Sequence, residues 1–303
     1  MWLAASLGAA VLFSVASFID EELLSVRLAG FSVTLLTVVA SLSGAPLLLG
    51  LGIVGASTGS LPGPSSALAG LVAGWLVIAG FQCYYKALER SSAFVAGSLF
   101  QLVVPFNYVF GRVFFDERLS TDEVIGVALI LCGSMALSYE RTSADQVRSL
   151  SVFYWMCGAS SLISISDVTF KSASIEDGFL PPAIAEYSAS VLAGLVILLV
   201  GRRVRDEARS LLRRREAASV GVPAHVNEVV VLAGTLLLRY AITSASLVVV
   251  QAVLASQPLI MLAIATALTH IRPLSLAPGL HSNSRAFNLV CTALIVCGGV
   301  ALA

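Results

Sequence analysis

Three charged side chains lie within apolar segments of this sequence, where an uncompensated charge is expensive: Asp167, Lys171 and Glu186. Asp167 and Lys171 are four residues apart, so on a helix they share a face and can neutralise each other. Glu186 lies near the start of the next apolar segment and could join them. A carboxylate in such surroundings can bind and release a proton, because desolvation favours its neutral form. The sequence leaves two interpretations open for these three residues, proton or ion coupling and a structural ion pair.

A second set of polar residues occupies equivalent places in the two halves of the chain. Lys86 and Arg239 each lie near the end of an apolar segment, where a cation could attract a carboxylate or phosphate, and neighbouring tyrosine rings could line its path. Alternatively, such cations reach toward lipid headgroups, with Lys86 paired to Glu89 on the same helix face. The candidates for solute binding in this set are Lys86, Tyr84, Tyr85, Arg239 and Tyr240.

Two prolines, Pro105 and Pro258, interrupt apolar segments and are separated by about half the length of the chain. Proline has no N–H, so the carbonyl groups four residues earlier, those of Gln101 and Leu254, lose their helical donor. The side chains of Gln101 and Gln257 add amide groups at about the same depth. We expect two kinked helices that expose polar groups to a solute near the middle of a membrane. Alternatively, the prolines only shape the bundle and the glutamines bond neighbouring helices.

The composition indicates an integral membrane protein. Hydrophobic residues make up 57% of the chain and charged residues 12%, and the mean hydropathy is +0.92. Soluble domains carry about twice that share of charge. A membrane-spanning helix needs about 20 mostly apolar residues. We predict ten spanning helices, at about 2–19, 28–52, 67–88, 92–115, 121–138, 151–172, 181–200, 227–243, 246–268 and 287–303.

The second half of the chain repeats features of the first. The segment CTALIVCGGVAL at 291–302 repeats GVALILCGSMAL at 126–137, and the segments around the two prolines also correspond. We therefore predict an all-α fold of two inverted five-helix repeats, at 1–141 and 151–303, joined by a polar linker at 142–150. Duplication of one membrane module is typical of secondary transporters.

Other classes of function find less support in the sequence. The five cysteines fall in apolar runs without CxxC spacing, so no disulfide framework, metal site or cofactor is indicated. A membrane enzyme would need His, Asp, Glu or Cys residues clustered at one depth, and a channel would need a filter sequence. We do not expect the protein to bind nucleic acid. A structural or sensory membrane subunit that transports nothing remains an alternative.

The segment FFDERLSTDEVIGVALILCG (114–133), with YYKALERSSAF (84–94) upstream, resembles the EamA-type permeases of the drug/metabolite transporter superfamily. Its GVALILCG part also resembles the last helix of small multidrug resistance proteins. The resemblance implies a cofactor-free permease or exporter that moves a small polar metabolite, such as an amino acid, by alternating access and works as a monomer. It further implies that Gly126 and Gly133 pack against Gly298 between the repeats. Antiport of drugs or quaternary cations is an alternative, although the expected first helix lacks a mid-membrane carboxylate.

The distribution of Lys and Arg predicts the orientation. If the ten helices alternate in direction, one face of the protein holds most of these residues, and the other holds Arg112, Arg118 and Lys171. The richer face is expected in the cytoplasm of a plasma (inner) membrane. It includes the segment Arg202–Arg215, which we expect to form a surface helix against anionic lipid headgroups. Binding of an acidic partner is the alternative for this segment.

This orientation can be tested with a single cysteine. In a chain whose native cysteines are replaced, Ser210→Cys should react with a membrane-impermeant maleimide only after the cells are opened. Labelling of intact cells from outside would contradict the predicted orientation.

Overall fold

The computed structural model describes residues 1–28, 30–139, 146–213 and 217–271, together with 290, 291, 293, 294, 297, 298 and 301. Within these residues all regular secondary structure is helical. A π-helical turn extends the first helix, and a 3₁₀ turn (Phe100–Leu102) joins the fifth helix to the sixth. The α-helices are α1 (Trp2–Glu22), α2 (Val33–Ser43), α3 (Ala45–Thr58), α4 (Pro64–Leu88), α5 (Ala93–Leu99), α6 (Val103–Phe115), α7 (Thr121–Tyr139), α8 (Gln146–Asp177), α9 (Leu180–Val200), α10 (Arg202–Arg213), α11 (Ala217–Ser244), α12 (Leu247–Leu254) and α13 (Gln257–Ile271).

Many of the helical segments are suited to a membrane. Among the described residues, seven are long and apolar enough to cross one, and the chain is an integral membrane protein. The expected spans at 121–138 and 151–172 correspond to α7 and α8, whereas the span expected at 287–303 lies largely outside the described residues. The seven segments are Trp2–Arg27, Val33–Thr58, Pro64–Leu88, Ala93–Phe115, Leu180–Val200, Val220–Ser244 and Leu247–Ala267.

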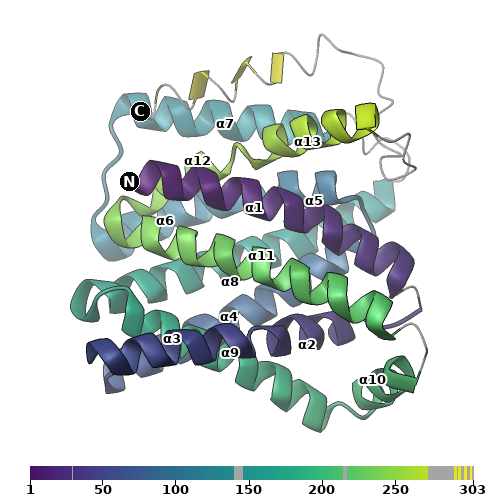
Figure 1. Ribbon diagram of the computed structural model, residues 1–303. Helices are drawn as coiled ribbons and strands as arrows, with labels where there is room; N and C mark the ends of the chain where they lie inside the picture. Colours follow the sequence, from purple (N-terminus) through teal and green to yellow (C-terminus); the bar gives the residue numbers. More distant parts are fainter. Residues whose placement is uncertain are drawn as a thin grey trace.

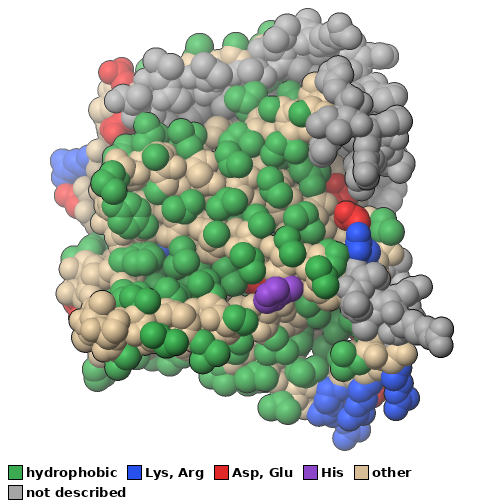
Figure 2. Space-filling model, in the orientation of Figure 1, with side chains coloured by type: hydrophobic (Ala, Val, Ile, Leu, Met, Phe, Trp, Pro, Cys, Tyr) green, Lys and Arg blue, Asp and Glu red, His purple; other side chains and the backbone are tan. Residues whose placement is uncertain are grey.

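The long helices run roughly alongside one another (Figure 1). α4 packs most extensively against α8 and α9, and α11 packs most extensively against α1. The N-terminus lies at one end of this bundle and α10 at the opposite end (Figure 1). Hydrophobic side chains cover most of the face seen in Figure 2, as expected for helices surrounded by lipid, and Lys and Arg side chains gather over α10.

Two predicted boundaries are wrong because charged residues do not end these helices. The first helix does not stop at residue 19, since α1 continues to Glu22 and the π-helical turn Leu23–Arg27 extends it. The helix predicted to begin at residue 227 begins earlier, since α11 starts at Ala217, and the surface helix expected at Arg202–Arg215 is present as α10 (Arg202–Arg213). A prediction from hydropathy ends a segment where charged residues begin, whereas the helix itself continues when those side chains find hydrogen-bonding or ionic partners.

Two of the spans are broken at corresponding places. A 3₁₀ turn separates α5 from α6 and ends three residues before Pro105. The residues Ala255 and Ser256 separate α12 from α13, and Pro258 is the second residue of α13. Neither proline has an N–H group, so an uninterrupted α-helix would leave one carbonyl oxygen without its hydrogen-bond donor. Each break begins shortly before the proline.

Glycines allow α4 to approach α9 closely. A Cβ atom built on Gly74 would lie 2.4 Å from the carbonyl oxygen of Glu186, and one built on Gly70 would lie 2.4 Å from the Cβ atom of Ala185. Close backbone approach through small residues is a common way to pack helices in membranes. The glycines singled out from the sequence, Gly126, Gly133 and Gly298, are buried, but the helix expected around Gly298 lies largely outside the described residues. Their mutual packing stays a prediction.

Substitution of Gly74 tests this contact. We expect Gly74→Ala to lower the free energy of unfolding by about 1–3 kcal/mol, because the added methyl group meets backbone atoms of α9. The matched control is Gly52→Ala in α3, where a Cβ atom would have nothing within 4 Å. The measurement is the melting temperature of the purified protein in detergent. Equal melting temperatures for the two variants would contradict the close α4–α9 packing.

Candidate functional site

The side chain of Arg239 joins three helices inside the bundle. It lies on α11, is 2% exposed, and forms ion pairs with Asp167 of α8 and Glu186 of α9, each at 2.5 Å. Its Nε donates to Glu186 Oε2 at 3.0 Å, and its Nη2 donates to Ser166 Oγ at 2.8 Å. The guanidinium also stacks over the ring of Phe170, 4.8 Å from its centroid. Most of the donors of Arg239 are therefore already engaged within the protein.

Asp167 extends this network to two further helices. Its Oδ2 atom accepts hydrogen bonds from Asn107 Nδ2 of α6 at 3.0 Å and from Gln251 Nε2 of α12 at 2.7 Å. Three donors thus point at one carboxylate. We refer to Asp167, Glu186 and Arg239 as the central ion cluster.

The pairing predicted between Asp167 and Lys171 is wrong. Lys171 instead pairs with Glu117 at 2.6 Å, and Asp167 pairs with Arg239. Residues four apart on a helix interact only weakly unless both side chains turn toward each other, and partners from other helices offer additional hydrogen bonds. The grouping of Glu186 with Asp167 agrees with the structure, although Arg239 rather than Lys171 joins them.

A cavity lies beside the central ion cluster. It has a volume of about 80 Å³, and helices from both halves of the chain line it. One water needs roughly 10–15 Å³ on this measure, so the cavity has room for several. Phe81 and Phe100 supply apolar walls and Ser17 a hydroxyl. The residues predicted from the sequence that line it are Tyr84, Gln101, Asp167, Arg239 and Gln257.

The two glutamines in this cavity are buried. Gln101 lies in the 3₁₀ turn between α5 and α6 and donates to the carbonyl oxygen of Gly97 at 3.0 Å. Gln257 begins α13 and donates to Ser17 Oγ at 3.4 Å, a long hydrogen bond. Both therefore sit at the helix breaks near the prolines and retain amide atoms that a bound solute could use.

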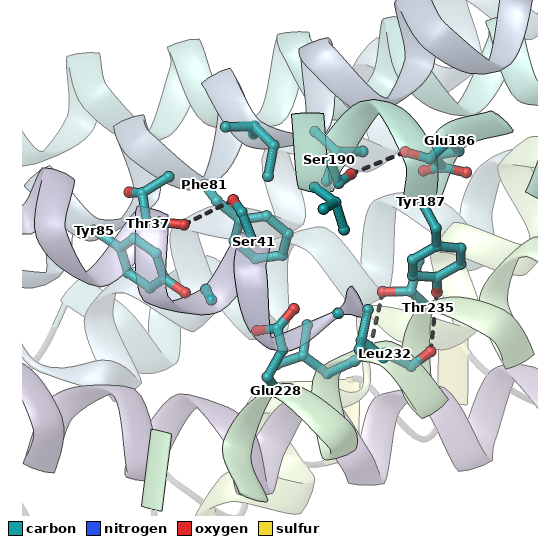
Figure 3. Close-up of a pocket in the computed structure, with 16 residues that line it drawn as sticks. Thr37, Ser41, Phe81, Tyr85, Glu186, Tyr187, Ser190, Glu228, Leu232 and Thr235 are labelled. Atoms are coloured by element: carbon teal, nitrogen blue, oxygen red, sulfur yellow. Dashed lines mark hydrogen bonds between the residues drawn. The ribbon is translucent and has the colours of Figure 1, made fainter. Parts of the chain in front are cut away.

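The other residues predicted from the sequence lie elsewhere. Tyr85 and Glu186 line a smaller neighbouring pocket (Figure 3). The Nζ atom of Lys86 lies 4.3 Å from the centroid of the Trp155 ring, a cation–π contact, and among the described residues it has no ion pair with Glu89. Tyr240 is 36% exposed and meets the edge of a phenylalanine ring.

Sequence reasoning missed three buried polar residues, Asp20, Asn227 and Glu228. Asp20 is 3% exposed and lines the cavity, and Glu228 is 8% exposed and lines the smaller pocket (Figure 3). Asn227 Nδ2 donates to Asp20 Oδ1 at 2.7 Å. Each residue stands at or next to a predicted helix end, where charge normally marks the membrane surface. Their burial could have been recognised only if α1 and α11 had been expected to extend past these predicted ends.

Comparison with known proteins bears on the identity of the chain. Residues 1–139 match the model of the EamA-like transporter family. The match covers less than half of the chain, so it shows an EamA-like segment at residues 1–139. The resemblance to the drug/metabolite transporter superfamily is thereby confirmed for residues 1–139.

The whole chain also resembles a protein of known structure. A structure titled "Crystal structure of protein" superimposes with a TM-score of 0.70 at 14% sequence identity, over 99% of this chain and 95% of that chain. At this identity the likeness shows a shared fold alone. No curated protein matches the sequence.

The EamA-like segment ends with α7 and supplies only part of the cavity. Tyr84 and Gln101 come from this segment, whereas Asp167, Arg239 and Gln257 come from the remainder of the chain. The cavity therefore exists only where the EamA-like segment meets the second half.

The turn after α6 in the EamA-like segment ties the two halves together. Glu117 in this turn accepts from Lys171 Nζ of α8, from Ser246 Oγ at 2.8 Å and from the backbone N–H of Leu247 at 3.1 Å. Lys171 also donates to the carbonyl oxygen of Ala245 at 2.9 Å. Burial by itself would raise the pKa of the Glu117 carboxyl, but the hydrogen bonds from Lys171, Leu247 and Ser246 outweigh it and lower the pKa. Glu117 thus caps the N-terminus of α12.

The lowered pKa of Glu117 gives a pH-dependent prediction. Glu117→Gln should lower the free energy of unfolding at neutral pH by about 1–3 kcal/mol, the contribution expected of hydrogen bonds to charged groups. The carboxylate stabilises the fold above the pKa of the unfolded chain, and this contribution is lost as the pH falls through the lower pKa of the folded state. The difference in melting temperature between wild type and variant should therefore shrink on acidification.

A control for this prediction is Arg118→Gln in the same turn, because the Arg118 side chain is 73% exposed. Exposed ion pairs contribute little, so this variant should melt close to the wild type at every pH. A melting difference for Glu117→Gln that stays constant or grows toward acid would contradict the assignment.

Proposed function

We propose that the protein is a secondary active transporter that moves a small polar solute across the membrane through the cavity between its two halves. The observation that carries the proposal is that the cavity has several polar side chains in its lining and is lined from both halves of a membrane protein. The match of residues 1–139 to a transporter family supports the same class of function. A structural or sensory subunit would have no need of such a cavity.

We further propose that the halves, 1–141 and 151–303 with a linker at 142–150, are inverted repeats that alternate access to the cavity. The contacts support this arrangement: α4 packs on α8 and α9, and α11 packs on α1 and α2. α4 is the third expected span of the first half and α11 is the third expected span of the second half. In both cases the third span therefore packs on the first two spans of the other half. The matching breaks before Pro105 and Pro258 support it too. Alternating access by two repeats around a shared site is a common transporter mechanism.

The charges around the cavity favour a solute that carries an amino group. Asp20 and Asp167 line the cavity, and the only cation that lines it, within the described chain, is Arg239. Arg239 is already shared between Asp167 and Glu186, so it is poorly placed to attract a carboxylate or phosphate. An amine would instead find acidic groups and the amide oxygens of Gln101 and Gln257. Amino acids and related amines are the solutes we propose.

The proposed orientation places α10 in the cytoplasm of a plasma (inner) membrane. α10 carries five arginines and gathers the basic side chains seen in Figure 2. Glu207 of α10 accepts hydrogen bonds from the N–H and the hydroxyl of Ser32, so α10 is anchored at the start of α2. Such a helix can rest on anionic headgroups. The proposed pathway lies within one chain, so we propose the monomer as the functional unit. We also propose that protons drive transport.

Uptake by proteoliposomes tests the proposed function. The purified protein is reconstituted and screened against amino acids, amines, sugars and phosphorylated metabolites, with and without a pH gradient. We expect uptake of an amine-bearing solute and at least about a tenfold loss with Gln101→Leu or Gln257→Leu, since one lost hydrogen bond contributes about 0.5–1.5 kcal/mol and an unpaired polar group adds to the loss.

The control for the uptake assay is Gln82→Leu, the same change at a glutamine that does not line the cavity. Uptake is normalised to the amount of folded protein, so a loss of stability is separated from a loss of transport. Transport that is insensitive to both cavity variants, or the absence of uptake for every solute class, would contradict the proposal.

A further inference from the structure

Two carboxylates that do not belong to the central ion cluster are buried on neighbouring helices of the bundle. Asp20 of α1 is 3% exposed and Glu228 of α11 is 8% exposed. The two helices that carry them, α1 and α11, pack against each other. Asn227, next to Glu228 in the sequence, donates a hydrogen bond to Asp20 at 2.7 Å. We call Asp20, Asn227 and Glu228 the acidic cluster.

The acidic cluster has no cation of its own among the described residues. No ion pair to Asp20 or Glu228 is found there, in contrast to Asp167 and Glu186, which share Arg239. The phenols of Tyr84 and Tyr85 of α4 and of Tyr187 of α9 interact with one or both of these carboxylates, and none of them supplies a positive charge. Two ionised carboxylates buried without compensation would cost several kcal/mol each. Something must neutralise at least one of them.

An unpartnered oxygen atom also belongs to this cluster. The Oδ1 atom of Asn227 has no hydrogen-bond partner within the described structure, although the residue is 3% exposed. Tyr84, 5% exposed, lines the cavity together with Asp20. Buried polar atoms are rarely left unpaired unless a ligand or water completes the site. Carboxylate, amide and hydroxyl oxygens are the groups that bind small inorganic cations.

The acidic cluster borders both spaces in the bundle. Asp20 lines the cavity, and Glu228 lines the smaller pocket between α2, α4, α9 and α11 (Figure 3). A cation that enters either space can therefore reach one of the two carboxylates. The acidic cluster thus shares these spaces with the central ion cluster, but only the latter contains a cation, Arg239, among the described residues.

We propose that Asp20, Glu228 and the Oδ1 atom of Asn227 form a binding site for one monovalent cation, a proton or Na⁺. A proton neutralises one carboxylate and leaves the other to accept hydrogen bonds, whereas Na⁺ is shared by the oxygens of the cluster. The proposal goes beyond transport of a solute, since it concerns binding to the protein in the absence of solute. It moves the coupling role that the sequence suggested for Asp167, Glu186 and Lys171 to a different pair of carboxylates.

Carbodiimide labelling tests the proposal on the full-length protein. Dicyclohexylcarbodiimide reacts with protonated carboxyl groups in apolar surroundings, and mass spectrometry locates the label. For a proton site we expect label on Asp20 or Glu228 that falls at least about tenfold as the pH rises across its titration range. For a Na⁺ site we expect NaCl, compared with KCl at equal ionic strength, to suppress the label or to raise the melting temperature. The Na⁺-dependent melting shift should disappear in Asp20→Asn and in Glu228→Gln.

The control is Glu22→Gln on the same helix, where the Glu22 side chain is 34% exposed and pairs with Arg27. This variant should keep the wild-type labelling pattern and the wild-type response to Na⁺. The labelling of the wild type needs no substitution, so the test holds even if a variant fails to fold. No label on either carboxyl at any pH, together with no Na⁺-specific change in melting, would overturn the proposal. Because no solute is present, failure here and failure of the uptake assay are distinguishable.

Discussion

The structure depends on how charge is compensated inside an apolar bundle. Arg239 is almost completely buried, and its guanidinium can be buried there only because Asp167 and Glu186 accept its hydrogen bonds. Arg239 and its two partners come from α11, α8 and α9, and Asn107 and Gln251 add α6 and α12 to the same network. One buried cation thereby fixes the relative positions of helices from both halves of the chain. The cavity lies beside this network, so the positions of the residues that line it depend on these ion pairs and hydrogen bonds.

The need to compensate buried charge also explains a further polar contact between the halves. The short turn after α6 would be an ordinary polar connection if Glu117 faced water. Instead its carboxylate caps α12 and pairs with Lys171, so the EamA-like segment is tied to the rest of the chain at one end of the bundle as well as in its middle. A transporter that rearranges its two halves must break or shift contacts of this kind. The central ion cluster and the Glu117 turn are therefore natural places for such a rearrangement.

Much of the fold could be predicted from the sequence because the membrane makes strong demands on it. Long apolar runs reveal the spans, and prolines within them mark the breaks at Gln101 and Gln257. The charged residues were harder to place, because spacing along one helix cannot reveal a partner on another. Lys171 has Asp167 four residues away, yet its partner is Glu117, far along the chain. Asp20 was missed because a charge at the end of an apolar run looks the same whether it meets headgroups or the interior.

The central claim is that the cavity beside Arg239 is an aqueous, acidic pathway for a solute. Thr235→Cys, at a residue that lines this cavity, tests it most directly in proteoliposomes of a chain without native cysteines. The claim predicts that a small cationic methanethiosulfonate reacts with this cysteine several-fold faster than an anionic one of similar size, while Leu68→Cys on an exposed part of α4 reacts with neither at a comparable rate. No reaction at Thr235→Cys with either reagent, or faster reaction with the anion, would contradict it.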